Sequence, residues 1–413
     1  MSHCNPEERQ VEPWVNEEGF QKLNLKNVET PCYIVSEGNL ERNLKILEKI
    51  QKDLGVKILI ALKCFSMYSV FPLIRKYLAG TEVSSVNEAR LGYEEFGKEN
   101  HIFSPSYTDK NIKEYIKYGN HISFNSFSQW NKFKKTIKNS LGRSPTGETK
   151  KKVSCGIRVN PEHSEGTMPM YDPCVPRSHL GVTLANFETN NMEGIEGLHF
   201  HTLCENGADK FARTLKAFEE KFGKFLGKMK WVNFGGGHLL TNSDYDLDLL
   251  YKVVSDFKKR YPHLTVYFEP GEAVVMNTGG LVASVIDIFN NGVDIAVLDV
   301  SAACHMPDVL EVPYLPKIVG AKPITGNCKI EGEKNVYKLV APTCLTGDVI
   351  GFYSFPNKLK IGDKIIFLNM AIYTMVKNNT FNGVNLPNIT KMDKKGKIKV
   401  LKRFGYEDFK RRL

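Results

Sequence analysis

The sequence predicts a (β/α)8 barrel, or TIM barrel, followed by a β domain. Between residues 38 and 270, short apolar runs rich in β-branched residues alternate with longer amphipathic stretches, the pattern of βα units around a parallel sheet. Eight such runs are present, and eight parallel strands close a barrel. After residue 280 the apolar runs follow one another without helical stretches between them, which indicates a domain built of strands.

Each barrel strand is expected where a short apolar run stands between polar segments. The eight runs lie at residues 57–62, 82–86, 101–104, 121–124, 153–159, 195–202, 231–234 and 264–269. An additional helix over residues 40–54 precedes the first strand. The helices between strands show apolar residues at helical spacing, as in Phe211, Leu215 and Phe218.

The β domain is expected to contain five strands, separated by turns such as Asn290-Asn291-Gly292. They lie at residues 281–289, 295–300, 336–341, 364–368 and 398–400. We therefore expect a barrel over residues 37–280 and a β domain over residues 281–413. The N-terminal segment, residues 1–36, is expected to pack on the β domain.

Positive charge is concentrated at the C-terminal end of the chain. The formal net charge of the 413 residues is +10, but residues 391–413 alone hold ten Lys and Arg against three acidic residues. No basic stripe interleaved with aromatic residues appears elsewhere. We interpret the tail as a solvated segment and expect no nucleic-acid partner.

Composition also indicates where the protein works. No apolar run approaches the ~18 residues that span a bilayer, and the first 30 residues lack the apolar core of a signal peptide. Nine cysteines without a C-x-x-C pair are typical of reduced thiols. We therefore expect a cytoplasmic protein without a membrane partner.

Active sites of (β/α)8 barrels lie at the C-terminal ends of the strands, so the residues after each strand are the candidates. The first strand ends in Lys63. A lysine there is costly to bury and is suited to form a Schiff base. Taken alone, Lys63 is more typical of a lysine that reaches the rim of the barrel and pairs with an acid.

The seventh and eighth strands end in residues suited to an anion and a heterocycle. Gly235, Gly236 and Gly237 follow the seventh strand, where phosphate sites of this fold typically form, because glycines expose backbone N–H groups. Glu269 ends the eighth strand. Its carboxylate can hold a proton on a heterocyclic nitrogen, or can be a salt-bridged acid of the rim.

The sixth strand ends with His199 and His201, which face the same side. They could bind a metal, but no third ligand stands at a convincing spacing nearby, so we expect no metal site. An amine, an anion site and a strand-end carboxylate are what pyridoxal 5′-phosphate requires. A protonated pyridine ring is the better electron sink for a carbanion, so the carboxylate favours decarboxylation over racemisation.

The chain resembles the barrel-type pyridoxal-phosphate decarboxylases related to alanine racemase, and among them most closely the carboxynorspermidine/carboxyspermidine decarboxylases. The resemblance extends over nearly the whole chain, from Thr30-Pro31-Cys32-Tyr33 to the C-terminal strands. The motifs that carry it are residues 61–63, 196–201, 231–238, 269–273, 305–308, 343–348, 373–374 and 380–383.

This resemblance implies roles for the strand-end residues. Lys63 forms the Schiff base with pyridoxal 5′-phosphate, Glu269 pairs with the pyridine nitrogen, and His201 stacks on the ring. The residues that hold the phosphate are then Gly235, Gly236, Gly237 and Tyr373. Cys344 corresponds to the proton donor of the family, and Asp348 lies in the same substrate-facing loop. A homodimer is implied, in which this loop reaches the barrel of the partner.

Departures from the family pattern concern the substrate. Glu272 stands where ornithine- and diaminopimelate-type relatives carry Arg, and Leu345 where the ornithine enzymes have an acid. We expect Glu272, Asp308 and Glu311 to form an acidic pocket for a polycation. His179 stands where the family pattern has an arginine. The sequence therefore leaves open whether His179 makes the carboxylate or phosphate contact of that arginine.

The function expected from this resemblance is decarboxylation of carboxynorspermidine or carboxyspermidine to norspermidine or spermidine, in polyamine biosynthesis. The first alternative is a decarboxylase of diaminopimelate, ornithine or arginine on the same fold. The second is a non-catalytic regulator that binds pyridoxal phosphate, which has no need of a proton donor. The sequence leaves open which triamine is preferred and whether the basic tail has a role.

Overall fold

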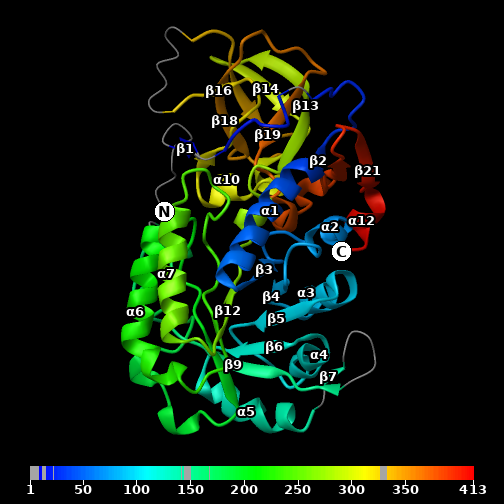
Figure 1. The fold of residues 1–413 in the computed structure, drawn as a ribbon. Helices are drawn as coiled ribbons and strands as arrows, with labels where there is room; N and C mark the ends of the chain where they lie inside the picture. The colour runs from blue at the N-terminus through cyan, green and yellow to red at the C-terminus, as the bar shows by residue number, and fades with distance from the viewer. Residues whose placement is uncertain are drawn as a thin grey trace. The chain divides into compact units, whose positions relative to one another are not determined.

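The computed structural model describes residues 9–11, 15–21, 23–140, 142–143, 150–166, 168–325 and 333–413 (Figure 1). The chain forms two compact units. One contains residues 43–274, and the other contains residues 1–42 together with 275–413. Among the described residues, no helix combines the length and the apolar character needed to cross a bilayer.

The unit of residues 43–274 is built on a closed barrel of eight parallel strands. Around the barrel their order is β10, β11, β12, β3, β4, β5, β6 and β9. Their bounds are β3 (Lys57–Ala61), β4 (Gly80–Val83), β5 (Glu99–Phe103), β6 (His121–Phe124), β9 (Ser154–Arg158), β10 (Ile195–His199), β11 (Trp231–Asn233) and β12 (Thr265–Phe268). The predicted fold class is therefore confirmed. Several strands end earlier than predicted, because the residues that follow them leave the sheet to form the loops of the candidate site.

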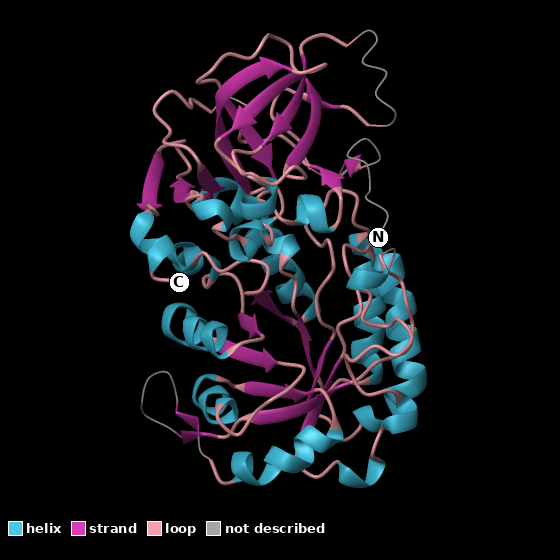
Figure 2. Ribbon diagram, turned by 180° about the vertical axis from the view of Figure 1, so that it is seen from behind, coloured by secondary structure: helices cyan, strands magenta, loops and turns pink. Residues whose placement is uncertain are grey.

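Helices surround the barrel strands (Figure 2). They are α1 (Glu37–Leu54), α2 (Phe71–Ile74), α3 (Val86–Leu91), α4 (Asn111–Tyr118), α5 (Phe127–Lys138), α6 (Ala208–Leu226), α7 (Leu247–Arg260) and α8 (Glu272–Val275). Side-chain caps begin several of them: Ser85 caps α3, Ser126 caps α5 and Asp246 caps α7. The longest, α6, buries one apolar stripe that includes Phe211 and Phe218.

One connection of the barrel departs from the βα pattern. Between β9 and β10 the described residues form three short 3₁₀ turns, at Pro169–Tyr171, Leu184–Asn186 and Thr189–Asn191. Just before β9, Gly142–Arg143 (β7) pairs with Lys150–Lys151 (β8). The long irregular segment after β9 carries His179, and its Val182 donates an N–H to the carbonyl of Arg158, the last residue of β9, at 2.9 Å.

The second unit contains a nine-stranded sheet. The strand order is β16, β18, β17, β14, β13, β2, β20 and β21, and β19 pairs with β13. The bounds are β2 (Cys32–Ser36), β13 (Gly279–Asn290), β14 (Asp294–Leu298), β16 (Lys322–Pro323), β17 (Val336–Val340), β18 (Val349–Ser354), β19 (Lys364–Leu368), β20 (Asn388–Met392) and β21 (Ile398–Lys402). β2 brings the N-terminal part of the chain into this sheet, where it pairs antiparallel to β13 and parallel to β20. A separate pair joins β1 (Gln10–Val11) to β15 (Tyr314–Leu315).

This unit also contains short helices where strands alone were expected. They are α9 (Ala302–His305), α10 (Asp308–Glu311), α11 (Thr374–Lys377) and α12 (Tyr406–Lys410). The expectation of a domain without helices is therefore wrong. A helix of four or five residues is little more than one turn, so its sequence cannot show the 3.6-residue period on which a helix prediction depends.

Candidate functional site

Glu269 is the centre of a buried polar cluster at the C-terminal end of the barrel strands. It follows β12, and its side chain is 3% exposed. Its Oε2 atom lies 3.3 Å from Nε2 of His199 and 3.9 Å from Nδ1 of His201, both of which come from the end of β10. The side-chain amide of Asn233, at the end of β11, donates a hydrogen bond to its other oxygen. Three adjacent strand ends therefore converge on one carboxylate.

Burial sets the charges of this cluster. Burial lowers the pKa of His201 to about 3, with the nearby charge of Lys63 acting in the same direction, and burial also lowers the pKa of His199. Burial acts to raise the pKa of Glu269. The contacts of Glu269 with His199 and His201 outweigh this effect and hold its pKa well below the usual value. The cluster thus holds an anionic carboxylate beside neutral imidazoles. The neutral ring of His201 accepts a hydrogen bond at Nδ1 from the N–H of Gly236, 3.0 Å away.

Lys63 stands in the turn that directly follows β3, where it is half-buried. The turn is held by the N–H of Leu62, which donates to the carbonyl of Glu82 on the next strand at 2.9 Å. Gly271 packs against the same turn, and a Cβ atom at that position would lie 2.4 Å from Cβ of Cys64. The charge of Lys63 lowers the pKa of both His201 and Glu82, so Lys63 lies within electrostatic reach of this cluster.

The three glycines after β11 are required by close packing. A Cβ at Gly235 would lie 2.5 Å from the carbonyl oxygen of Phe200, and one at Gly237 2.0 Å from that of Leu203. Both glycines also have a positive φ, +70° and +81°. The N–H of Gly235 donates to Asn233 and that of Gly236 to His201. Of the three, Gly237 is therefore the one whose N–H is not committed to another described residue.

Two of the predicted substrate residues lie in the barrel unit. Glu272 is the first residue of α8, and its charge helps burial to raise the pKa of Cys204 to about 12. His179 lies in the irregular segment after β9, and its backbone carbonyl accepts a hydrogen bond from the side-chain amide of Asn125 at 2.8 Å. The contacts of Glu272 and His179 with substrate stay predictions.

The remaining predicted site residues belong to the other unit. Tyr373 precedes α11 with φ 50° and ψ −40°, and the N–H of Thr374 donates to the carbonyl of Ile372. This is a γ-turn centred on a non-glycine residue at positive φ, a strained conformation that costs on the order of 1–3 kcal/mol. Such strain is concentrated at functional sites, in agreement with the predicted phosphate contact, which itself stays a prediction.

Cys344 lies in the loop between β17 and β18 and is exposed. Asp348, in the same loop, is 2% exposed. Its carboxylate accepts hydrogen bonds from the hydroxyl of Ser301 at 2.6 Å, the N–H of Ala303 at 3.0 Å and the hydroxyl of Thr343 at 2.5 Å. These bonds fix the shape of the loop. A contact of Asp348 with substrate stays a prediction.

Asp308 and Glu311 are the first and last residues of α10. Their carboxylates both accept a hydrogen bond from Nζ of Lys377, the last residue of α11. An ammonium group of the protein thus already occupies the space between the two acids. The predicted binding of a substrate cation by Asp308 and Glu311 would require these carboxylates to exchange or share that partner.

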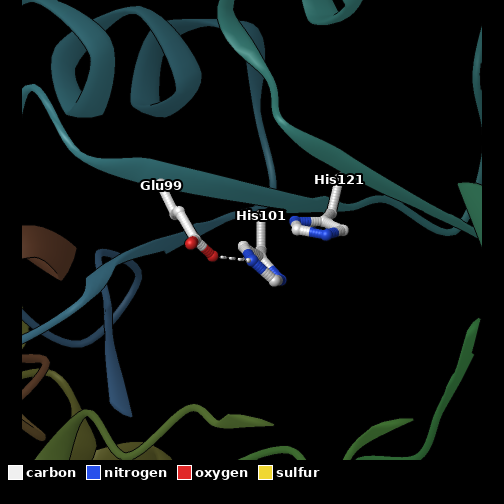
Figure 3. A group of neighbouring side chains, drawn as sticks. All are labelled: Glu99, His101 and His121. Carbon is white, nitrogen blue, oxygen red and sulfur yellow. Dashed lines mark hydrogen bonds and ion pairs between the residues drawn. The ribbon is translucent and has the colours of Figure 1, made fainter. Parts of the chain in front are cut away.

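Apart from the Glu269 cluster, residue types that can bind a metal also come together on the first half of β5 and at the start of β6. These residues are Glu99, His101 and His121 (Figure 3). Glu99 already accepts hydrogen bonds from Lys57 and from the hydroxyl of Tyr267. The ring centroids of His101 and His121 are 3.9 Å apart. Two imidazoles bound to one tetrahedral zinc ion would have centroids about 5 Å apart. The group is therefore a pair of tilted histidine rings in contact, beside an ion pair, and this spacing is shorter than two zinc-bound imidazoles would have.

Comparison with known proteins identifies the family. The sequence matches the family described as pyridoxal-dependent decarboxylase, C-terminal sheet domain, over residues 32–371. The chain belongs to this family.

Individual members of the family match nearly the whole chain. The carboxynorspermidine/carboxyspermidine decarboxylase of Campylobacter jejuni is 42% identical, over 93% of this chain and 98% of its own. The carboxyaminopropylagmatine decarboxylase of Synechocystis sp. is 40% identical, over 95% of this chain and 98% of its own. The crystal structure of carboxynorspermidine decarboxylase from C. jejuni complexed with norspermidine has a TM-score of 0.84 and 40% identity, covering 94% of this chain and 100% of that chain.

These comparisons confirm three predictions: the family, the activity class of a pyridoxal-dependent decarboxylase, and pyridoxal 5′-phosphate as cofactor. The named relatives are decarboxylases, which favours an enzyme over the alternative of a non-catalytic regulator. The residues of the barrel site fit the cofactor. Lys63 provides an amine, Glu269 an anionic carboxylate for a pyridine nitrogen, and the loop at Gly237 an N–H group close to the strand ends. Oε2 of Glu82 has no hydrogen-bond partner among the described residues, although Glu82 is buried.

Two charged members of the decarboxylase site were not predicted. Arg158 ends β9, donates to the carbonyl of His201 at 2.8 Å and lies over the ring of Phe103. Burial lowers its pKa to about 10, so it remains a cation. Burial also raises the pKa of Glu82, and the charge of Glu269 raises it further. For Arg158, a charged residue at the end of an apolar strand was the available signal. Glu82 lies within its strand, where no such signal was present.

Proposed function

We propose that this pyridoxal-dependent decarboxylase removes the α-carboxylate of carboxynorspermidine or carboxyspermidine and produces norspermidine or spermidine. The observation that carries the proposal is the 42% identity, over nearly both full chains, to the C. jejuni decarboxylase named for these substrates. The similar chain that was solved with norspermidine supports it. The cytoplasm is the proposed site of action, in agreement with the cysteine pattern.

In the proposed reaction, the bond between the α-carbon and the carboxylate breaks, CO2 leaves, and a proton takes its place on the same carbon. Bound pyridoxal 5′-phosphate supplies the electron sink for the electron pair left on that carbon. Lys63 supplies the amine that holds the cofactor. Glu269, kept anionic in its buried cluster, holds a proton at the pyridine nitrogen. His201 packs against the ring, and Cys344 delivers the proton to the α-carbon.

A polycationic substrate accounts for the acidic residues near the site. Glu272 provides a carboxylate at the start of α8, where it can attract the amine groups distant from the reacting carbon. Asp308 and Glu311 are proposed to extend this acidic pocket when an amine group of the substrate replaces Lys377 as their partner. Such charge pairs direct specificity when they are desolvated.

We also propose that two copies of the chain share each active site. Cys344 is exposed, and two large apolar side chains near it are also exposed: Leu345 by 45% and Phe381 by 46%. The backbone N–H of Cys344 donates to the side chain of Asn382, which joins the two loops that carry these residues. Exposed apolar residues grouped around an exposed thiol favour a protein interface. A two-fold dimer would place each Cys344 loop at the partner's barrel.

The test of the proposed substrate is CO2 release by the purified holoenzyme on a panel of compounds. We expect the highest kcat/KM with carboxynorspermidine or carboxyspermidine. Ornithine, arginine and diaminopimelate should be at least a hundredfold poorer. A higher kcat/KM for carboxyaminopropylagmatine, the substrate named for the Synechocystis relative, would reassign the substrate within the same chemistry.

The attachment of the cofactor is tested separately. Borohydride reduction of the holoenzyme followed by peptide mapping should label Lys63. The Lys63→Ala variant should lose the absorbance band of the bound cofactor. A label on a different lysine would contradict the assigned role of Lys63.

A further inference from the structure

The backbone of Cys344 is held by a side chain from a distant loop. The N–H of Cys344 donates to Oδ1 of Asn382 at 2.9 Å, across 38 residues of sequence. The thiol itself is exposed and belongs to a loop between two strands. This one hydrogen bond therefore ties the main chain at Cys344 to the loop that contains Asn382.

The loop that contains Asn382 is itself anchored. Asn379 donates from its side-chain amide to the carbonyl of Ala303 at 2.8 Å, and its Oδ1 accepts the N–H of Phe381 at 3.0 Å. The N–H of Asn379 donates to the carbonyl of Cys304 at 2.9 Å. Because Ala303 and Cys304 belong to α9, Asn382 extends from a fixed support toward Cys344.

The same helix region holds the other side of the cysteine loop. Thr343, the neighbour of Cys344, donates to the carboxylate of Asp348, which also binds the hydroxyl of Ser301 and the N–H of Ala303. Asp348 thus fixes the residue before the cysteine, and Asn382 fixes the cysteine itself. Together the two contacts restrict the direction in which the Cys344 side chain leaves the backbone.

The backbone at Asn382 explains why an asparagine is found there. Asn382 has φ 56° and ψ 13°, in the left-handed region that asparagine tolerates better than most residues. Its short side chain also carries the acceptor for the N–H of Cys344. Glycine would keep the backbone conformation and lose the acceptor, whereas aspartate would keep both properties.

We infer that Asn382 is a positioning residue for the Cys344 thiol. This inference rests on the proposed function, in which Cys344 protonates the α-carbon. A proton donor acts only within hydrogen-bonding reach of the reacting atom, and a displacement of about 1 Å can reduce the rate on the order of a hundredfold. Asn382 acts through the main chain of Cys344 and leaves substrate binding unchanged.

The test compares three variants of the holoenzyme. Asn382→Gly should lower kcat about tenfold and leave KM within twofold, whereas Asn382→Asp should stay within threefold of the wild-type kcat because a carboxylate oxygen accepts the same N–H. The matched control is Asn335→Gly. Asn335 also has a positive φ, 51°, and its side chain donates to the carbonyl of Phe355, in a turn away from the cysteine loop. Equal losses in the two glycine variants would mean a general structural role and would overturn the inference.

A second measurement does not require cofactor or turnover. In the cofactor-free protein, iodoacetamide should alkylate Cys344 at least threefold faster in Asn382→Gly than in the wild type, because the loop is less constrained. The rate in Asn335→Gly should match that of the wild type. Peptide mass spectrometry measures the modification at Cys344 alone. An unchanged rate in Asn382→Gly contradicts the inference even if its activity falls.

A double variant separates the inference from the proposed function. If Asn382 acts through Cys344, Asn382→Gly should not lower further the residual decarboxylation rate of Cys344→Ala, followed at high enzyme concentration. Losses that multiply would show that Asn382 acts elsewhere. Full activity of Cys344→Ala would instead refute the donor role within the proposed function. An inactive Cys344→Ala beside a normal Asn382→Gly would refute the positioning role alone.

Discussion

The Nε2 atom of His199 lies 3.3 Å from Oε2 of Glu269, and both side chains are almost fully buried. Burial lowers the pKa of His199, whereas the charge of Glu269 acts to raise it, and the same contact lowers the pKa of Glu269. Burial lowers the pKa of Arg158 to about 10 although the charge of Glu269 opposes this shift, so Arg158 is a buried cation of the same cluster. Glu269 therefore stays anionic at the barrel mouth.

The first prediction concerns this charge. Glu269→Gln should lower kcat by about a hundredfold or more, since loss of a positioned proton partner typically costs factors of 10² to 10⁴. Cofactor binding, measured by absorbance, should persist because Lys63 is intact. Glu99→Gln is the matched control, an acid at the opposite ends of the strands, and should keep kcat within threefold. Near-normal turnover in Glu269→Gln would contradict the assigned role.

The second prediction concerns the acidic pocket. Neutralising Glu272 or Asp308, as Gln or Asn, should cost about 2–5 kcal/mol in transition-state binding if each forms a desolvated pair with the substrate. A solvated pair would cost less than about 1 kcal/mol. Steady-state kcat/KM for carboxyspermidine measures the difference. The pocket assignment is wrong if both variants keep near-normal kcat/KM, or if the wild type prefers ornithine.

The third prediction concerns the shared site. Lys63→Ala and Cys344→Ala should each keep only a small residual activity, but a mixed dimer of the two would contain one site with both changes and one with neither. Random pairing makes half of the dimers mixed, so mixing should restore up to about a quarter of the wild-type activity per subunit. Mass spectrometry of intact dimers verifies the exchange. Exchange without recovered activity, or a fully active monomer, rules out the shared site.

The fourth prediction concerns stability at acid pH. Burial lowers the pKa of His238 to about 3 in the folded protein, against about 6.5 for an ordinary histidine. Below pH 6.5 the unfolded chain binds a proton that the folded protein does not. The contribution of His238 to the free energy of unfolding is therefore complete above pH 6.5 and is lost as the pH falls toward 3.

At pH 5.5 this loss amounts to about 1.4 kcal/mol for one such histidine. In His238→Phe, which suits a site where the imidazole packs against Phe211 and Phe268, that loss should be absent. Urea unfolding at pH 7.5 and pH 5.5 tests this, because the stability difference between the two pH values should shrink by about that amount. An equal pH dependence in variant and wild type would show that His238 is protonated in the folded state.

The sequence by itself determined the barrel and much of its site. Eight apolar runs of strand length are specified locally, and parallel strands in a barrel bring all their C-terminal ends to one face. For this reason Lys63, His201 and Glu269 could be grouped although they are far apart in the chain. The lysine, the glycines after the seventh strand and Glu269 together indicated the cofactor, which the comparisons confirm. The family motifs then added Cys344 and Tyr373.

Only the tertiary structure decided the electrostatics of the site and the short elements. Glu82 stood at the start of the predicted second strand, yet the strand begins at Gly80 and Glu82 is buried in it beside Glu269. The sequence showed no third residue near His199 and His201 that could bind a metal. Glu269 reaches these histidines from another strand, so only the folded chain brings the three together. Burial and partner distance depend on residues remote in sequence. For the same reason, the bond that ties Asn382 to Cys344 could be found only in the folded chain.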